Sequence, residues 1–132
     1  MSNNKRVLVI DDQKDSRVFV KTVLSETGDF DTAEAENGDD ALRLLNEYIP
    51  DLIILDVVMP GMNGMTLFHQ LKQKEETRNI PVIMLTGIAD DIGIKFTAEG
   101  IEENLGAAPA AFIEKPADPA ELQREIVKAL EL

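Results

Sequence analysis

The chain has 132 residues, of which 44% are hydrophobic and 29% are charged, a balance that fits one compact domain with a hydrophobic core. It contains no cysteine, which excludes disulfides, thiolate nucleophiles and Cys-ligated zinc. The 25 acidic and 13 basic residues give a formal net charge of −12, which repels nucleic acid and anionic membranes, and no stretch has the length of a membrane span. We therefore expect neither nucleic acid nor a membrane as a direct partner.

The first predicted strand covers residues 6–10, a continuous apolar run that ends at Asp11 and Asp12. Short apolar runs rich in β-branched residues are typical of strands that are buried on both faces of a parallel sheet. A helix is predicted over 14–26, where apolar residues recur at helical spacing.

A basic edge runs along this predicted helix, formed by Lys14, Arg17 and Lys21, whose spacing places them on one side. Such an edge is either an ordinary solvated face or a docking surface for a partner. In so acidic a chain it is a candidate docking edge.

Residues 30–35 form a weaker predicted strand, whose polar residues favour the edge of a sheet. A helix over 39–48 follows. Its buried side is expected from Ala41, Leu42, Leu44, Leu45, Tyr48 and Ile49. The next strand covers 52–55 and stops at Asp56, before two turn-forming dipeptides. A single Asp at a strand end often only caps the following helix, so the role of Asp56 depends on the rest of the chain.

A helix over 65–75 and a strand over 80–85 come next, and Thr86 follows the strand. His69, the only histidine, has no second His or Cys beside it and is expected at the surface. The stretch 88–109 has helical apolar spacing interrupted by glycines, which predicts one irregular helix or two short ones.

The last predicted strand covers 110–113 and is followed by Lys115, and Asp118 caps a final helix. The buried side of that helix is expected from Leu122, Ile126 and Leu130. Five strands alternating with five helices predict an α/β fold with a doubly wound parallel sheet and helices on both faces. In the strand order 2-1-3-4-5, the switch point between strands one and three opens a crevice at their carboxyl ends.

Every unusual strand end converges on this crevice. Asp11, Asp12 and Asp56 would meet in it, with Thr86 and Lys115 on its rim. Two carboxylates about 4 Å apart repel each other by about 4 kcal/mol at an effective dielectric constant near 20, so three of them favour a bound divalent cation. Ligands that are all oxygen suit Mg²⁺ or Mn²⁺, whereas zinc usually recruits His or Cys.

This set of groups matches phosphoryl transfer to an aspartate. Asp56 would attack phosphorus, Lys115 and the cation would neutralise phosphoryl oxygens, and the Thr86 hydroxyl would donate a hydrogen bond to one of them. No second general acid or base is apparent, so efficient turnover of a released substrate is not expected.

Four motifs in order resemble the receiver domain of two-component response regulators, over essentially the whole chain. They are Asp11-Asp12, the stretch ILDVVMPGMNG from Ile54 to Gly64, Thr86-Gly87, and FIEKP from Phe112 to Pro116. The resemblance implies the flavodoxin-like receiver fold and a cytoplasmic protein. It also implies that Asp56 receives a phosphoryl group from a phosphohistidine on a sensor histidine kinase or a histidine phosphotransfer protein, with Mg²⁺ as cofactor.

The resemblance further implies that the acidic residues bind the cation in different ways. Asp12, Asp56 and the Val58 carbonyl would bind Mg²⁺ directly, while Asp11 would act mainly through water. The peptide bond between Lys115 and Pro116 is often cis in this family, which would aim the lysine.

A conformational switch is also implied, in which the Thr86 hydroxyl moves to the phosphoryl group and the Phe112 ring turns inward behind it. The change would alter the face formed by helix four, strand five and helix five, which controls an unidentified downstream protein. A plain core role is the alternative for Phe112.

Two departures from the family pattern carry expectations of their own. Val58 and Ile88 are apolar where receivers border the phosphoryl pocket, so neither can orient an attacking water and self-dephosphorylation should be slow. The segment between Thr86 and Lys115 is longer than the family usually shows, so family dimer arrangements are not assumed. We expect a monomer or a dimer that depends on phosphorylation.

We expect a single receiver domain over 1–132 with no output domain. It is either a stand-alone receiver that acts through protein contacts or a receiver excised from a longer chain. The family commonly docks its phosphodonor on helix one, so Lys14, Arg17 and Lys21 are the expected docking residues.

Three alternatives stay open. A small phosphohydrolase of the haloacid-dehalogenase type also uses an Asp after a hydrophobic strand, but it normally needs a second Asp where this chain has Val58. A flavodoxin-like cofactor binder would need a phosphate-binding first loop rich in Ser, Thr and Gly, which is missing here. A degenerate receiver that works without phosphate is disfavoured by the intact set of site residues.

Overall fold

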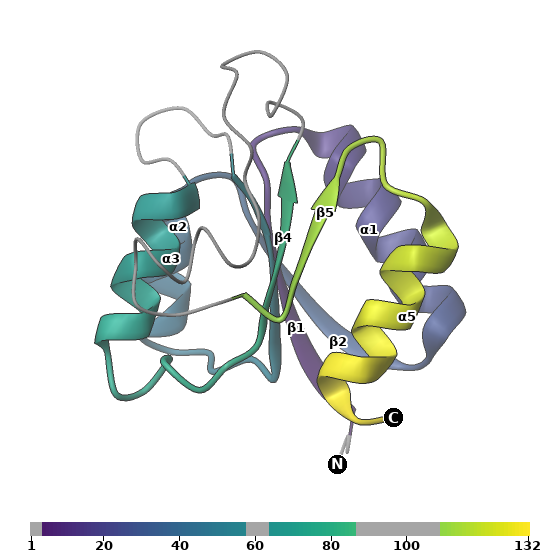
Figure 1. The fold of residues 1–132 in the computed structure, drawn as a ribbon. Helices are drawn as coiled ribbons and strands as arrows, with labels where there is room; N and C mark the ends of the chain where they lie inside the picture. The colour runs from purple at the N-terminus through teal and green to yellow at the C-terminus, as the bar shows by residue number, and fades with distance from the viewer. Residues whose placement is uncertain (1–3, 58–63, 87–108) are drawn as a thin grey trace.

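The computed structural model describes residues 4–57, 64–86 and 109–132, and every structural statement below concerns these residues. At its centre is a five-stranded parallel sheet in the order β2-β1-β3-β4-β5 (Figure 1). Its strands are β1 (Lys5–Ile10), β2 (Phe30–Ala35), β3 (Leu52–Asp56), β4 (Val82–Thr86) and β5 (Ala111–Glu114). The predicted fold class and strand order are confirmed.

The position of each strand follows from its composition. β3 and β4 are buried at every residue, as continuous apolar runs require when helices cover both faces of a sheet. β2 lies at one edge, where its polar residues reach solvent, as predicted. β5 forms the other edge of the sheet.

Helices cover both faces (Figure 1). α1 (Lys14–Thr27) and α5 (Pro119–Leu130) lie on one face, and α2 (Gly38–Leu45) and α3 (Gly64–Gln73) lie on the other. Alternate residues of each central strand therefore enter different cores. In β3, Ile53 and Leu55 pack toward α2 and α3, whereas Leu52 and Ile54 pack toward α1 and α5. Burying one such side chain contributes about 1.5–3 kcal/mol, so both cores hold the sheet in place.

Helix ends show where local chemistry decides the structure. The Asp118 carboxylate accepts a hydrogen bond from the Ala120 amide at 3.1 Å and caps α5, as predicted. The prediction for the second helix was too long, because α2 ends at Leu45 and the following residues form turns. Ile49, expected on its buried side, lies beyond the helix with 47% of its surface exposed.

Two further expectations concern the rest of the chain. The helical segment predicted over 88–109 lies outside the described residues, except for its last position. His69 is exposed, as predicted. In the parts of the chain that are described, we find no helix with the length and apolar character needed to span a membrane.

Candidate functional site

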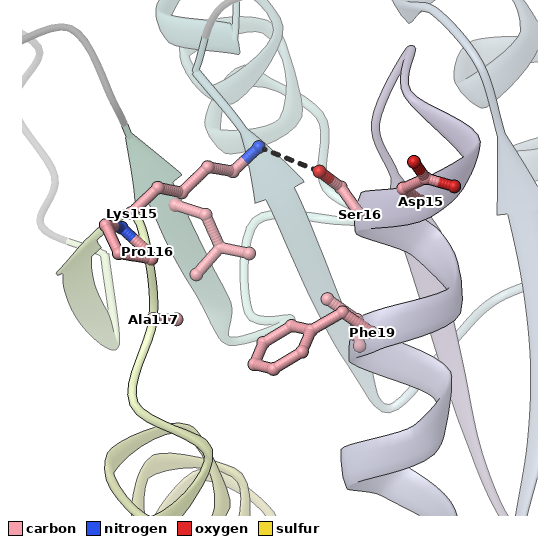
Figure 2. Close-up of a pocket in the computed structure, with 8 residues that line it drawn as sticks. Asp15, Ser16, Phe19, Lys115, Pro116 and Ala117 are labelled. Atoms are coloured by element: carbon pink, nitrogen blue, oxygen red, sulfur yellow. Dashed lines mark hydrogen bonds between the residues drawn. The ribbon is translucent and has the colours of Figure 1, made fainter.

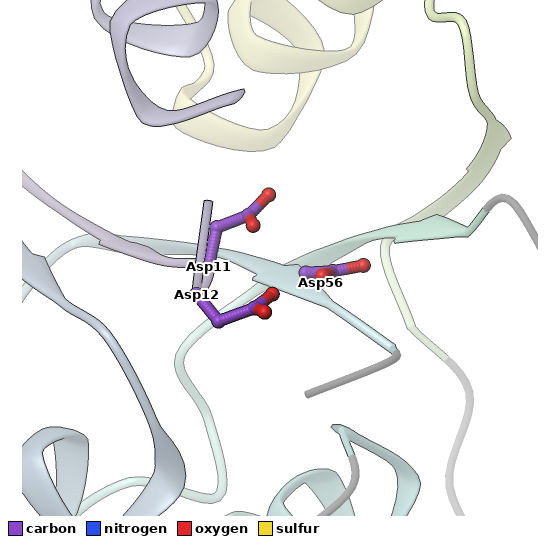
Figure 3. Close-up of side chains that lie close together, drawn as sticks. All are labelled: Asp11, Asp12 and Asp56. Carbon is purple, nitrogen blue, oxygen red and sulfur yellow. The ribbon is translucent and has the colours of Figure 1, made fainter. Parts of the chain in front are cut away.

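Three carboxylates meet at the carboxyl ends of β1 and β3. Asp11 and Asp12 follow β1 directly, and Asp56 is the last residue of the neighbouring strand β3. Each offers an oxygen within 4.8 Å of those of the other two, and Figure 3 shows the three side chains converging. Asp11 and Asp56 are 2% and 5% exposed, while Asp12 is more open to solvent. The predicted meeting of these residues is confirmed.

Lys115 brings a positive charge to the cluster from the segment after β5. Its ammonium donates a hydrogen bond to Asp11 Oδ2 at 3.0 Å and lies 3.4 Å from Asp56 Oδ1. It also lies 3.4 Å from the Ser16 hydroxyl in the first turn of α1. The bond between Lys115 and Pro116 is cis, as predicted. Lysine and carboxylates therefore share one site although they are far apart in sequence.

The balance of charge fits a hard divalent cation. Among the described contacts, the Lys115 ammonium reaches two carboxylates that are almost fully buried, and Asp12 adds a third negative group beside them. Buried anions need compensating charge, and one ammonium leaves an excess of negative charge here. The donors are carboxylate oxygens, the ligands that Mg²⁺ or Mn²⁺ prefers. The Val58 carbonyl, expected as a further ligand, lies outside the described residues.

The turn that carries Asp11 is fixed at several atoms. The Asp11 amide donates to the carbonyl of Ala35 at 3.0 Å, and its carboxylate accepts from the Gln13 amide at 2.9 Å. Its carbonyl accepts from Arg17 Nη1 at 2.8 Å. Because the Asp11 carboxylate is already shared by Gln13 and Lys115, it is less available to a metal than the more open Asp12.

Thr86 and Phe112 lie on adjacent strands. Thr86, at the end of β4, is fully buried. Phe112 is paired with Met84 across β4 and β5, and its half-buried ring packs in the core next to α2 and α3. Strand alternation places Thr86 on the same side of the sheet as Met84. The Thr86 side chain and the Phe112 ring therefore lie on the same face of the sheet.

The predicted basic edge is only partly present. Arg17 is just 8% exposed, and its Nε donates to Glu34 Oε1 at 3.0 Å. Lys21 donates to the other oxygen of Glu34, also at 3.0 Å, and Lys14 is exposed. We predicted one basic edge formed by all three cations, and this is wrong for Arg17, because the helix turns it toward Glu34 of β2 and Glu36 just after that strand.

Glu34 shows the electrostatic effect of this arrangement. The hydrogen bond from Lys21 lowers its pKa, partial burial opposes that effect, and Arg17 adds a further lowering. Glu34 and Glu36 were not predicted as partners of the basic edge, although the Glu36 carboxylate lies 3.6 Å from Arg17 Nη2. The available signal was one glutamate on the predicted edge strand and a second just after it, together with two cations four residues apart on the preceding helix.

A pocket of about 520 Å³ opens next to Lys115, between α1 and the segment after β5 (Figure 2). Its lining is largely apolar, with Phe19, Pro116 and Ala117 among the residues drawn. Ser16 and Lys115 stand at its polar side and contact each other. Ile88, predicted to border the phosphoryl pocket, lies outside the described residues.

Comparisons with known proteins agree with this geometry. Residues 7–127 match the family model described as "Response regulator receiver domain". The chain is 38% identical over 122 residues to the phosphate regulon transcriptional regulatory protein PhoB of Escherichia coli, a match that covers 92% of this chain and 50% of PhoB. It is 32% identical over 131 residues to the chemotaxis protein CheY-3 of Vibrio cholerae, which covers 99% of this chain and 95% of CheY-3.

A solved structure shows the same fold. The crystal structure of a putative response regulator from Chloroflexus aurantiacus superposes with a TM-score of 0.82 at 27% identity, covering 98% of this chain and all of that one. The chain spans about half the length of PhoB, so the match concerns only part of that protein. Fold, acidic pocket and family model agree, and the chain belongs to the response regulator receiver domains of two-component signalling.

Proposed function

We propose that Asp56 accepts a phosphoryl group from a phosphohistidine donor, in a reaction that requires Mg²⁺ or Mn²⁺, and that the phosphorylated form controls a protein partner. One observation carries the proposal. The nearly buried Asp56 carboxylate ends a central strand with two further carboxylates within 4.8 Å and the Lys115 ammonium at 3.4 Å. A nucleophile, a site for a cation and a fixed positive charge are the parts that phosphoryl transfer to an aspartate needs.

In the transfer, a carboxylate oxygen of Asp56 attacks phosphorus while the bond from phosphorus to the imidazole nitrogen breaks. The imidazole keeps the electron pair of that bond and takes up a proton from solvent. Lys115 already contacts Asp11 and Asp56. When Asp56 carries the phosphoryl group, the Lys115 ammonium can contact a negatively charged phosphoryl oxygen instead. A divalent cation held by Asp12 and Asp56, with Asp11 behind them, would neutralise the negative charge on the phosphoryl group.

We propose that Thr86 and Phe112 form a conformational switch at this site. The Thr86 hydroxyl donates to a phosphoryl oxygen from the side of the sheet opposite to Lys115, and the Phe112 ring moves into the space behind it. New charge-assisted hydrogen bonds bias the equilibrium between two packings of this region. The partner would detect the change on the surface formed by β5, α5 and the helical segment predicted over 88–109, nearly all of which lies outside the described residues.

Histidine kinases are the partners with which receiver domains pair, and we propose that the donor docks on α1. Lys14 is exposed, and the exposed Val18 lies on the same helix. Charge reversal at Lys14 and Lys21, with Arg17 left in place, should slow transfer from the cognate donor. An unchanged transfer rate would exclude this docking surface.

The lifetime of the phosphorylated form is a separate part of the proposal. Val58 and Ile88 offer no polar group to orient water, so hydrolysis of the Asp56 phosphoryl group should be slow. A Val58→Asn variant should lose the group faster. Loss within seconds from the unchanged protein, or equal rates in the two proteins, would contradict this expectation.

The central experiment is intact-mass measurement after incubation with acetyl phosphate or phosphoramidate and Mg²⁺. We expect one phosphoryl adduct that requires the metal and is absent from Asp56→Asn. Continuous release of phosphate would instead favour a phosphohydrolase. An adduct that persists in Asp56→Asn would exclude Asp56 as the acceptor.

A further inference from the structure

Arg17 is a buried cation beside the acidic cluster. Charged side chains are rarely this buried unless they are paired and hydrogen-bonded, and Arg17 meets three different groups. Its Nη1 donates to the Asp11 carbonyl at 2.8 Å, its Nε donates to Glu34 at 3.0 Å, and its Nη2 lies 3.6 Å from the Glu36 carboxylate. The guanidinium therefore ties the turn after β1 to the edge strand β2.

The bond to the Asp11 carbonyl acts on the peptide group that joins Asp11 to Asp12. The backbone before this group is fixed by the Asp11 amide on Ala35, and the backbone after Asp12 is fixed by the Gln13 amide on the Asp11 carboxylate. Arg17 supplies the remaining constraint. If the peptide group could rotate, the Asp12 carboxylate would no longer be held facing Asp56.

We infer that Arg17 is a positioning residue for the divalent-cation site: its planar fork orients the peptide between Asp11 and Asp12 before the cation binds. The inference rests on the proposed function, because it assumes that the acidic cluster binds the cation. Groups that orient metal ligands from behind typically change metal affinity by about 10- to 100-fold when they are removed. A guanidinium suits this task because it bonds a carbonyl and a carboxylate at once in a fixed geometry.

Electrostatics alone predicts that loss of Arg17 strengthens Mg²⁺ binding, whereas the positioning role predicts weaker binding. The direction of the change in Mg²⁺ affinity therefore tests the inference. Removing a positive charge near three carboxylates should strengthen their attraction for Mg²⁺. Removing a positioning residue should weaken Mg²⁺ binding. Lys21 provides the matched control, because it contacts the other oxygen of Glu34 and makes no hydrogen bond to Asp11 within the described part of the chain.

The experiment compares Arg17→Met and Lys21→Met with the unchanged protein by calorimetric Mg²⁺ titration at constant ionic strength. Urea unfolding without Mg²⁺ separates stability from affinity. We expect Arg17→Met to bind Mg²⁺ about 10-fold more weakly or worse. Lys21→Met should bind Mg²⁺ as tightly as the unchanged protein or slightly more tightly. Exchange of the Gln13 amide in metal-free protein should also be faster in Arg17→Met, since that amide bonds to Asp11.

Arg17→Lys keeps the charge but loses the fork, and it tests the inference if Arg17→Met does not fold. It should weaken Mg²⁺ binding less than Arg17→Met does. Unchanged or tighter binding in the folded Arg17 variants would overturn the positioning role, and so would an equal loss in Lys21→Met. Failure of the unchanged protein to bind Mg²⁺ at all would instead refute the proposed function.

Discussion

At the scale of single residues, Lys115 has two competing effects on the site. Its ammonium contacts both Asp11 and Asp56, and it therefore occupies carboxylate oxygens that a cation could use. We predict that Lys115→Met binds Mg²⁺ more tightly, by about 1 kcal/mol or roughly fivefold, because this partly exposed ion pair no longer competes. Phosphorylation by acetyl phosphate should be slower, because the phosphoryl charge loses its fixed cation.

Calorimetric titration and intact-mass time courses would check the two effects of this substitution separately. Lys14→Met is a suitable control, since it removes the same charge from an exposed position on α1. Weaker Mg²⁺ binding in Lys115→Met would show that the lysine organises the carboxylates rather than competing for them.

We predict that Glu34 makes the free energy of unfolding depend on pH. Its pKa in the folded protein lies below the ordinary 4.5, mainly because Lys21 donates a hydrogen bond to it. A group with a depressed folded pKa contributes its stability above the unfolded pKa and loses it as pH falls through the folded value. The free energy of unfolding of Glu34→Gln should therefore be lower than that of the unchanged protein at neutral pH, by less than about 1 kcal/mol for so exposed a pair.

This difference should shrink as the pH falls below 4.5, which urea unfolding at several pH values would measure. Glu47→Gln, at an exposed position, controls for the general loss of a negative charge. A difference that stayed constant down to the lowest pH would contradict the assigned role of Glu34.

Residues also mark the limit of prediction from sequence. Asp11, Asp56 and Lys115 could be placed together because strand ends in a parallel sheet share one edge. The buried position of Arg17 could not be predicted, because it depends on which side of α1 faces β2. The packing of the whole helix decides that orientation.

At the scale of elements, the junction between β3 and α3 is held by a close backbone contact. The Gly64 amide donates to the Val57 carbonyl at 2.6 Å, and a Cβ at Gly64 would lie 2.6 Å from Val57 Cα and also strike the Asp56 carbonyl. We predict that Gly64→Ala lowers the free energy of unfolding by about 1–3 kcal/mol, because the backbone must shift. It should also slow phosphorylation, since the backbone that shifts carries Asp56.

Gly28→Ala is the matched control for this prediction. A Cβ there would lie 3.5 Å from the Phe30 ring, an ordinary contact, so its effect on the free energy of unfolding should stay within about 0.5 kcal/mol. Urea unfolding of both variants would compare them. Similar effects at the two glycines would mean that the junction tolerates the extra atom.

The sequence predicts elements better than it predicts their ends. β3 and β4 are continuous apolar runs, and no other element competes for those residues. α2 ends three residues before the predicted limit, because tighter hydrogen bonds between residues three apart, such as that from the Glu47 amide to the Leu44 carbonyl at 3.0 Å, replace the helix. The apolar pattern continues through the turn, so periodicity alone does not reveal this end.

At the scale of the whole molecule, the net charge of −12 makes the folded state repel itself. We predict that raising KCl from about 0.05 to 0.5 M stabilises the protein, because the screening length falls from more than 10 Å to a few ångströms. Mg²⁺ should stabilise it further at matched ionic strength, by about 2.7 kcal/mol when its concentration is 100 times the dissociation constant.

Urea midpoints in KCl with and without Mg²⁺ would measure both effects. Asp12→Asn should keep the response to KCl and lose most of the additional response to Mg²⁺. An equal response to Mg²⁺ in this variant would place the stabilising cation elsewhere on the molecule.

Lys115 and Phe112 lie on opposite faces of the sheet. Lys115 reaches the acidic cluster from the α1 side, where the pocket opens, while Phe112 packs on the side of α2 and α3. The proposed docking residues of α1 and the proposed switch residue Phe112 therefore pack in different layers, although the proposed output face also includes α5. Substitutions on the α1 surface can then leave the packing of Phe112 unchanged, so the surface proposed to meet the donor can change without repacking the proposed switch residue.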